Sequence, residues 1–418
     1  MRKTMDNRQG TMDNSELPKG WEIKKLGDVC EVQRGLTYSG KDAVDFSNNI
    51  VLRATNINLK NCSLDFSELK YLRNDFSIQE KYKLKKGSLL ICFSSGSKSH
   101  LGKVALVDKD YEYSFGGFIG QINPDNKILS KYLFFSLISE NYKIYISELT
   151  DGININNLKI KDLQQYQIPL PPLPEQKCIV SILDRAFEAI DKAKANAEQN
   201  LKNAKELFES YLQGVFENKG DDWEEKTLKE VGIVQTGTTP PTKDKSNYGN
   251  YIPFAKPAHF KPNGSIETGE SMLSEQGLKK GRLFEKNSIL MVCIGATIGK
   301  TGFSSKSISS NQQINSLTPN NNYYARFFYY AFISSSFQKQ VLTQGKSAQA
   351  TLPIINKTKW ENLKVIFPKS ISEQQQIVQK LDSLSTETKK LESIYQQKID
   401  DLEELKKSIL QKAFNGKL

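Results

Sequence analysis

Histidine is almost absent from this 418-residue sequence, and cysteine is sparse. Only His100 and His259 occur, and neither has a partner at the spacing of a helical metal-binding motif. A zincin-type site and a histidine-activated nucleophile are therefore not expected. The five cysteines are scattered without a C-x-x-C pair. This pattern disfavours a zinc site and a disulfide framework, and it is typical of a reducing cytoplasm.

Long apolar runs are also lacking. No stretch approaches the length that a membrane-spanning helix needs. Residues 1–16 are polar and have no apolar core of a secretory signal, so we expect a short N-terminal extension, no membrane association and a cytoplasmic location. Hydrophobic residues still make up 38% of the chain and aromatic residues 10%, which is enough to build globular cores.

Known catalytic motifs are missing as well. Residues 295–301, GATIGKT, look like a phosphate-binding loop, but the glycine required five positions before Gly299 is Ile294. In the first half of the chain, Gly102-Lys103 is followed by Val104, so the hydroxyl that would bind magnesium is missing. No Asn/Asp-Pro-Pro-aromatic motif of adenine methyltransferases occurs. We therefore predict no catalytic residues, no metal site and no cofactor in this chain.

What the sequence does contain is an internal repeat. Trp21-Glu22 recurs as Trp223-Glu224, and Glu175-Gln176 recurs as Glu373-Gln374. Further matches keep the register: Val29 with Val231, Gly35 with Gly237, Leu183-Asp184 with Leu381-Asp382, Leu212-Gln213 with Leu410-Gln411, and Phe216 with Phe414. Because a fixed period marks a repeated structural unit, each half should form a similar globular domain followed by a long helix.

Each globular segment, residues 17–172 and residues 220–371, combines short alternating or apolar stretches with few helices. Strands are predicted at residues 29–33, 87–93, 104–107 and 287–294, and largely buried helices at residues 132–138 and 326–333. Gly35 is expected to turn the chain after the first strand. This mixture is typical of a mixed α/β (α+β) domain of irregular topology.

Proline-rich exits introduce two long helices, predicted at residues 173–219 and 372–418, with Ser372 as the cap of the second. Apolar residues recur at heptad spacing in both. The first stripe includes Ile179, Leu183, Ile190, Ala197, Ala204, Leu207 and Tyr211; the second includes Ile377, Leu381, Leu384, Leu391, Leu402, Leu405 and Ile409. A helix of about 40 residues is about 60 Å long, more than one small domain can cover. The two helices should therefore pair with each other.

The positive charge lies on the globular segments. The chain carries +11 overall, whereas residues 175–217 sum to −2 and residues 373–417 to 0, which leaves +13 for the rest. A basic globular surface indicates a polyanionic partner, and nucleic acid is the leading candidate. A lysine-rich surface that only confers solubility is the simpler alternative.

The order of these motifs resembles the specificity subunit of type I restriction-modification systems. The resemblance rests on Leu17-Pro18-Lys19-Gly20-Trp21, the Pro-Leu-Pro-Glu-Gln sequence at 172–176 and the tandem duplication, and it covers all but residues 1–16. It implies two target-recognition domains that each read half of a bipartite double-stranded DNA sequence, joined by two helices that form an antiparallel coiled coil. It also implies a non-catalytic subunit that docks two methyltransferase subunits carrying S-adenosylmethionine, with restriction endonuclease/translocase subunits joining the assembly.

Candidate DNA-binding residues come from polar, glycine-bearing stretches that follow the predicted strands. They are Arg34, Tyr38, Lys41, Ser95, Lys98, Lys103, Thr238, Lys243, Lys256, Lys300 and Gln312. Lysines would hold phosphates, and a few side chains would read base edges. Two other functions remain open from the residues alone: a self-contained DNA-modifying enzyme with an unrecognised active site, and a coiled-coil scaffold that binds only protein.

Overall fold

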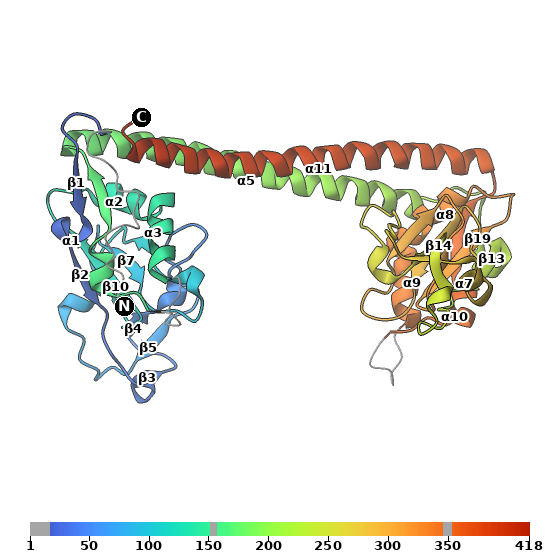
Figure 1. The fold of residues 1–418 in the computed structure, drawn as a ribbon, viewed down its shortest axis with the longest axis horizontal. Helices are drawn as coiled ribbons and strands as arrows, with labels where there is room; N and C mark the ends of the chain where they lie inside the picture. The colour runs from blue at the N-terminus through green and yellow to red at the C-terminus, as the bar shows by residue number, and fades with distance from the viewer. Residues whose placement is uncertain (1–16, 151–156, 346–352) are drawn as a thin grey trace. The chain divides into compact units, whose positions relative to one another are not determined.

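The structure is a computed structural model that describes residues 17–150, 157–345 and 353–418 (Figure 1). The chain divides into two compact units. The first comprises Met1–Ala197 and Gln397–Leu418, and the second comprises Glu198–Gln396. Each unit therefore contains one globular domain together with parts of both long helices. The predicted extension at residues 1–16 lies outside the described residues.

The first globular domain is built on two sheets. A four-stranded antiparallel sheet has the order β2 (Cys30–Arg34), β10 (Ile119–Pro124), β7 (Leu89–Cys92), β8 (Val104–Leu106). A five-stranded sheet has the order β3 (Ala43–Val44), β5 (Lys70–Leu72), β4 (Asn49–Leu52), β9 (Tyr111–Phe115), β6 (Lys83–Leu84). The remaining elements are the pair β1 (Glu22–Lys25) and β11 (Gln167–Leu170), and the helices α1 (Leu26–Val29), α2 (Ser130–Leu137), α3 (Glu140–Thr150) and α4 (Ile160–Leu163).

The second globular domain repeats the four-stranded sheet in the same order. Its strands are β13 (Gly232–Thr236), β19 (Ile314–Pro319), β16 (Ser288–Val292) and β17 (Thr301–Ser304). Its second sheet is smaller, with the order β15 (Met272–Leu273), β14 (Tyr248–Ala255), β18 (Ser309–Ser310). The pair β12 (Trp223–Thr227) and β20 (Lys364–Pro368) and the helices α6 (Leu228–Val231), α7 (Glu275–Lys280), α8 (Ala325–Ile333), α9 (Ser335–Gly345) and α10 (Lys357–Glu361) complete it. The mixed α/β class is confirmed, as are the strands and buried helices predicted in both halves.

The sequence repeat reappears as repeated contacts where each domain joins its helix. The indole Nε1 of Trp21 donates to Glu175 Oε1 at 2.9 Å, and that of Trp223 donates to Glu373 Oε1 at 3.0 Å. The neighbouring glutamine is fully buried in both halves. Its amide accepts from the backbone N–H before α2 or α8 and donates to the carbonyl of the proline-rich exit. The same two bonds therefore fix each domain onto the helix that follows it.

The long helices are α5 (Leu173–Glu217) and α11 (Ile371–Phe414). In the first unit they run antiparallel: Lys194 lies 2.5 Å from Glu403, and Lys406 lies 2.8 Å from Asp191, so rising numbers on one helix meet falling numbers on the other. In the second unit, Leu212 of α5 shares a buried cluster with the start of α11. The predicted helix pair is confirmed.

The predicted heptad seam on α11 is partly wrong. Five of its residues are buried or half-buried as predicted: Ile377, Leu381, Leu384, Leu402 and Ile409. Leu391 and Leu405 are exposed, and the residues one position later, Glu392 and Lys406, are half-buried instead. On α5, Leu207 and Tyr211 are likewise exposed. The aliphatic stem of a lysine can cover apolar surface, and Lys406 lies over the Phe187 ring at 4.5 Å. Leucine content alone therefore misplaces the seam.

Two local predictions also need correction. Helix α11 begins at Ile371, so Ser372 lies inside it, and the hydroxyl of Ser370 accepts from the Glu373 N–H instead. Gly35 is required for a close approach instead of a turn, because a Cβ there would lie 2.3 Å from the Phe115 carbonyl oxygen. Gly237 has the same constraint against Asn311, at 2.1 Å. Within residues 17–150, 157–345 and 353–418, no helix has the length and apolarity to cross a membrane.

Candidate nucleic-acid interface

In the first domain, three chain segments meet at one edge of the four-stranded sheet. Strands β2 and β7 end there and β10 begins there, as the pairs Arg34 with Gly120 and Cys92 with Ile119 show. The Leu36 N–H donates to the Phe115 carbonyl at 2.9 Å. We call residues 34–38, 93–95 and 116–118, together with Asn157 and Leu158, the first loop edge. It presents loops from several strands on a rigid sheet, which is where binding residues are commonly placed.

The second domain forms the equivalent edge. The Thr238 N–H donates to the Ser310 carbonyl at 2.9 Å, and the Cys293 N–H donates to the Gln313 carbonyl at 2.8 Å. The Thr239 hydroxyl donates to Gln312 Oε1 at 2.5 Å. We call residues 236–239, 293–295 and 311–313, together with Ile354 and Ile355, the second loop edge. It is rich in amides and hydroxyls, the groups that read base edges in DNA grooves.

Arg34 belongs to the first loop edge but is held by the protein. Its guanidinium donates to Asn157 Oδ1 at 2.9 Å and to the Leu158 carbonyl at 3.1 Å, and it lies 5.0 Å from the centroid of the Phe93 ring. The Ser94 hydroxyl donates to the same Asn157 oxygen at 2.8 Å. Arg34 therefore supports the edge, and only its remaining N–H groups are available to a ligand.

The other candidates on this side differ in accessibility. Tyr38 is half-buried against Leu36, Val51 and Leu72, and burial raises the pKa of its phenol. Lys41 is exposed in a short 3-10 turn, as a phosphate-binding lysine would need to be. The Ser95 hydroxyl accepts from the Ser97 N–H at 3.3 Å and remains partly exposed.

In the second domain the structure brings three candidates together. Thr238 and Gln312 lie in the second loop edge, and Lys256 directly follows β14. The Asn311 N–H donates to the Ala255 carbonyl at 3.1 Å, which places Lys256 beside the edge. Gln312 and Lys256 are exposed. Lys243 is also exposed, in the segment before the 3-10 helix Lys245–Asn247.

Three candidate lysines line cavities between secondary-structure elements instead of belonging to the loop edges. They are Lys98, Lys103 and Lys300. Lys98 and Lys103 line a cavity of about 370 Å³ with residues of α3, where Lys98 donates to the Thr150 carbonyl at 3.2 Å and burial lowers the pKa of Lys103. Lys300 lines a cavity of about 810 Å³ shared with α8, α5 and α11 within the second unit. Lys103 and Lys300 each follow a glycine turn, and Lys98 lies in a serine-rich turn, so the sequence pattern grouped all three with the loop edges. The fold instead places them in these two cavities.

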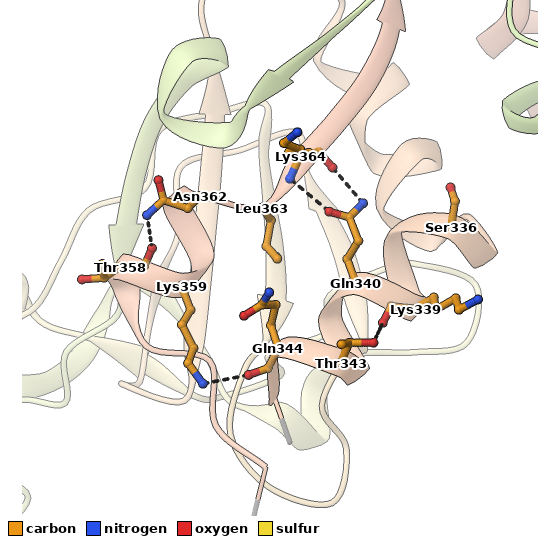
Figure 2. A pocket seen from close by; sticks show the side chains of 10 residues that line it. All are labelled: Ser336, Lys339, Gln340, Thr343, Gln344, Thr358, Lys359, Asn362, Leu363 and Lys364. Carbon is orange, nitrogen blue, oxygen red and sulfur yellow. Dashed lines mark hydrogen bonds between the residues drawn. The ribbon is translucent and has the colours of Figure 1, made fainter. Parts of the chain in front are cut away.

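Figure 2 shows a further polar pocket, of about 630 Å³, between α9 and α10. Its lysines suggest an anion site, but two of them are already engaged. Lys359 donates to the Gln344 carbonyl at 2.8 Å, and Lys364 pairs with Glu225 at 2.7 Å. Gln340 is held by two hydrogen bonds to the backbone of Lys364. We therefore place no ligand site there.

Sequence reasoning missed some residues of the loop edges. Phe118 and Asn157 are in the first edge, and neither was a candidate. The Gly-Gly-Phe sequence at 116–118 was the available signal for Phe118. Asn157 carries no local pattern, because its role depends on contacts with Arg34 and Ser94 more than 60 positions away. Over the described residues, no group of three or more His, Cys, Asp or Glu side chains is placed to hold a metal ion.

Comparison with known proteins agrees with the repeat of one globular domain in each half of the chain. The sequence matches the family described as type I restriction modification DNA specificity domain twice, over residues 18–202 and 220–402. It is 26% identical to the StySPI specificity subunit of Salmonella potsdam, over 97% of this chain and 91% of that protein. It is 34% identical to the EcoKI specificity subunit of Escherichia coli K12, over 50% of this chain and 45% of that protein.

Two solved structures share the fold. A chain from a study of the assembly and conformational transition of a type I restriction-modification system aligns with a TM-score of 0.74 at 20% identity, covering 96% of this chain and 99% of that one. The HsdS subunit from Thermoanaerobacter tengcongensis aligns with a TM-score of 0.61 at 20% identity, covering 96% and 98%. The chain belongs to the type I restriction-modification DNA specificity family, with one copy of the family's domain in each half.

Proposed function

We propose that the two globular domains each read one half of a bipartite, asymmetric double-stranded DNA target, with the paired helices setting the distance between the half-sites. One observation carries this proposal: the same sheet edge occurs twice, and the side chains that reach solvent at it differ. The first edge presents Phe118 and Ser95, and the second presents Thr238 and Gln312. Repeated scaffolds with different exposed groups suit two different base sequences.

We infer that the chain does not catalyse a reaction itself. The related specificity subunits belong to restriction enzymes, and this sequence contains no Asn/Asp-Pro-Pro-aromatic motif of adenine methyltransferases. Methyl transfer would come from two docked methyltransferase subunits that bind S-adenosylmethionine, and cleavage from restriction endonuclease/translocase subunits. All of these would assemble in the cytoplasm. Methylation or cleavage of DNA by the purified chain alone would instead support a self-contained enzyme.

DNA affinity should depend steeply on salt. The globular segments carry +13, so phosphate contacts would release counterions on binding. For about six to ten contacts, affinity falls by a factor of about 10³ to 10⁵ between 50 and 200 mM salt. The measurement is equilibrium binding of the chain assembled with its methyltransferase partners across that range. A nearly flat dependence, or no binding at any salt, would favour the scaffold alternative.

Recognition and spacing should be separable. Replacing residues 17–172 with a different recognition domain should change one half-site and leave the spacing unchanged. Inserting about one heptad into both helices, between Ala186 and Ala204 and between Leu384 and Leu402, adds about 10 Å per helix. The preferred gap should grow by about three base pairs, with both half-site sequences unchanged. Selection of targets from a random DNA pool measures both effects, and an insertion that altered the bases read would contradict the spacer role.

A further inference from the structure

Phe118 is an exposed aromatic residue in the middle of the first loop edge. It follows Gly116 and Gly117 in the connection from β9 to β10, and 72% of its surface is exposed. In the described part of the chain, no aromatic ring or cation stacks on it. Phe46, in the same domain, is 79% exposed but lies 5.3 Å from the ring of Tyr71. A single exposed apolar ring is common on protein surfaces. Phe118 is distinguished by its position in the middle of the first loop edge and by the rigid backbone that carries it.

The backbone that carries this ring is fixed in place. The Phe118 carbonyl accepts from the Phe93 N–H at 2.9 Å and from the Ser94 N–H at 3.0 Å. The Ile119 N–H donates to the Gly116 carbonyl at 2.9 Å, which closes the turn. Because the backbone is held on both sides, little conformational freedom would be lost when the ring meets a ligand.

Polar groups lie close to the ring's backbone. The Ser94 N–H binds the Phe118 carbonyl, and the Ser94 hydroxyl bonds to Asn157, which also accepts from Arg34. An apolar ring beside hydrogen-bonding groups is complementary to a base edge that carries an apolar group next to a polar one. Thymine in the major groove offers a carbonyl acceptor and a 5-methyl group side by side.

The second domain has a different chemistry at the same place. The Gln313 carbonyl accepts from the Cys293 N–H, as the Phe118 carbonyl accepts from the Phe93 N–H. Position 313 therefore corresponds to position 118, and it carries an amide that accepts from Asn311 at 2.9 Å. The ring is thus a property of the first domain alone and is not needed by the shared scaffold.

We propose that Phe118 contacts the 5-methyl group of a thymine in the first half-site and contributes to its specificity. This inference rests on the proposed function, because it requires the first loop edge to face a DNA groove. The contact removes a methyl group and part of the ring from water. The free energy gained by burying one methylene-sized group corresponds to a change of about fourfold in the affinity for DNA.

The test uses the full chain assembled with its methyltransferase partners and the target selected from a random DNA pool. Each thymine of the first half-site is replaced in turn by uracil, which lacks only the methyl group. In the unsubstituted protein, one replacement should weaken binding about fourfold. In Phe118→Ala, binding to the thymine target should be weaker by a similar factor, and the same uracil should have no further effect. Phe118→Leu should keep most of the thymine preference.

Phe46→Ala is the matched control, because it removes a similarly exposed ring from the connection between β3 and β4, and it should keep the full uracil response. The proposal is overturned if Phe118→Ala responds to every uracil as the unsubstituted protein does, or if the first half-site contains no A·T pair. It is also overturned if 2-aminopurine beside the site brightens on binding in a Phe118-dependent way, since that would indicate ring insertion between base pairs.

Failure of the proposed function gives a different result. If exchange of residues 17–172 leaves both half-sites unchanged, the domain does not read DNA at all. If the exchange changes one half-site while Phe118→Ala changes nothing, only the role of Phe118 is lost. Thermal unfolding of Phe118→Ala should match that of the unsubstituted chain, because the ring makes little contact with the protein.

Discussion

The two globular domains support the same backbone carbonyl in different ways. In the first, Arg34 of β2 donates to the Leu158 carbonyl, and its guanidinium lies over the Phe93 ring. In the second, Asn315 of β19 donates to the equivalent Ile355 carbonyl at 3.1 Å. The donor therefore lies on β2 in the first domain, and on β19, the counterpart of the neighbouring strand β10, in the second. The comparison shows that the fold requires a donor at this point, and that the donor's identity is set by the volume of the side chains around it.

That volume is set by one pair of positions. In the first domain the Phe93 ring fills the space beside Gly120. A Cβ on Gly120 would lie 2.2 Å from that ring. The second domain has the small Cys293 in place of the phenylalanine and Asn315 in place of the glycine, as the strand register shows. A large residue at one position therefore excludes a side chain at the other, and the asparagine donor is available only where the neighbour is small.

The largest expected effect comes from breaking this pairing. Gly120→Asn should destabilise the first unit by about 3 kcal/mol or more, because its Cβ would overlap both Phe93 and the Gln33 carbonyl. Adding Phe93→Cys and Arg34→Thr, which reproduces the second domain's set, should recover part of this loss, because it removes the overlap with the Phe93 ring and leaves the contact with the Gln33 carbonyl. Urea unfolding of the unsubstituted chain and of both variants measures this. A triple variant no more stable than Gly120→Asn would show that the two domains differ by more than this set.

A smaller effect should follow from removing the buried glutamine that both domains share. Gln176→Ala leaves the Leu129 N–H and the Pro171 carbonyl without partners, and Gln374→Ala leaves the Tyr324 N–H and the Pro368 carbonyl without theirs. Each should cost about 2–3 kcal/mol. The exposed Gln375→Ala is the control and should cost less than about 0.5 kcal/mol. A loss confined to one domain would show that the repeated contacts are not equivalent.

The smallest effect compares one matched ion pair. Asp382 accepts from Arg326 through both oxygens and from Tyr330, whereas Asp184 accepts from the single ammonium group of Lys131 at 2.7 Å. Because Asp382 is more than a third exposed, we expect Asp382→Asn to cost only about 1–2 kcal/mol and Asp184→Asn less than about 0.5 kcal/mol. Chemical denaturation of both variants measures this difference. Equal costs would mean that the two-oxygen geometry adds nothing.

The contribution of the Asp382–Arg326 ion pair to stability should depend on pH. Burial raises the pKa of Asp382, but hydrogen bonds from Arg326 and Tyr330 and the guanidinium charge outweigh it, so the pKa lies below its ordinary value. A lowered folded-state pKa contributes stability that is present above the ordinary carboxyl pKa and is lost as pH falls through the lowered one. The difference between Asp382→Asn and the unsubstituted chain should therefore shrink in that acidic window. A difference independent of pH would contradict this origin.

Much of the fold could be predicted from the sequence because its determinants are local or repeated. Apolar stretches marked β7 and β16, and the Trp-Glu and Glu-Gln matches marked the junctions between domain and helix. The coiled-coil seam was predicted in part. Leu391 and Leu405 are as apolar as the buried Ile399, and only the partner surface distinguishes them.

The candidate site was harder to predict. Exposed lysines such as Lys41 and Lys256 can be found from the sequence pattern. Lys300 follows the same pattern but lines a cavity between α5, α8 and α11. The partnership of Arg34 with Asn157 spans 123 positions and has no local signature. Residues brought together by the ends of several strands become visible only once the strands are paired.

The two long helices also determine when each domain can finish folding during synthesis. Helix α11 begins in the core of the second domain, at Val378 and Leu381, and ends in the core of the first, at Leu410, Ala413 and Phe414. The ring of Phe414 lies 5.2 Å from that of Tyr132. The first domain, although made first by the ribosome, therefore lacks part of its core until the whole second domain has been translated. Its nascent form should spend that interval exposed to chaperones and proteases, while the second domain waits only for the helix that directly follows it.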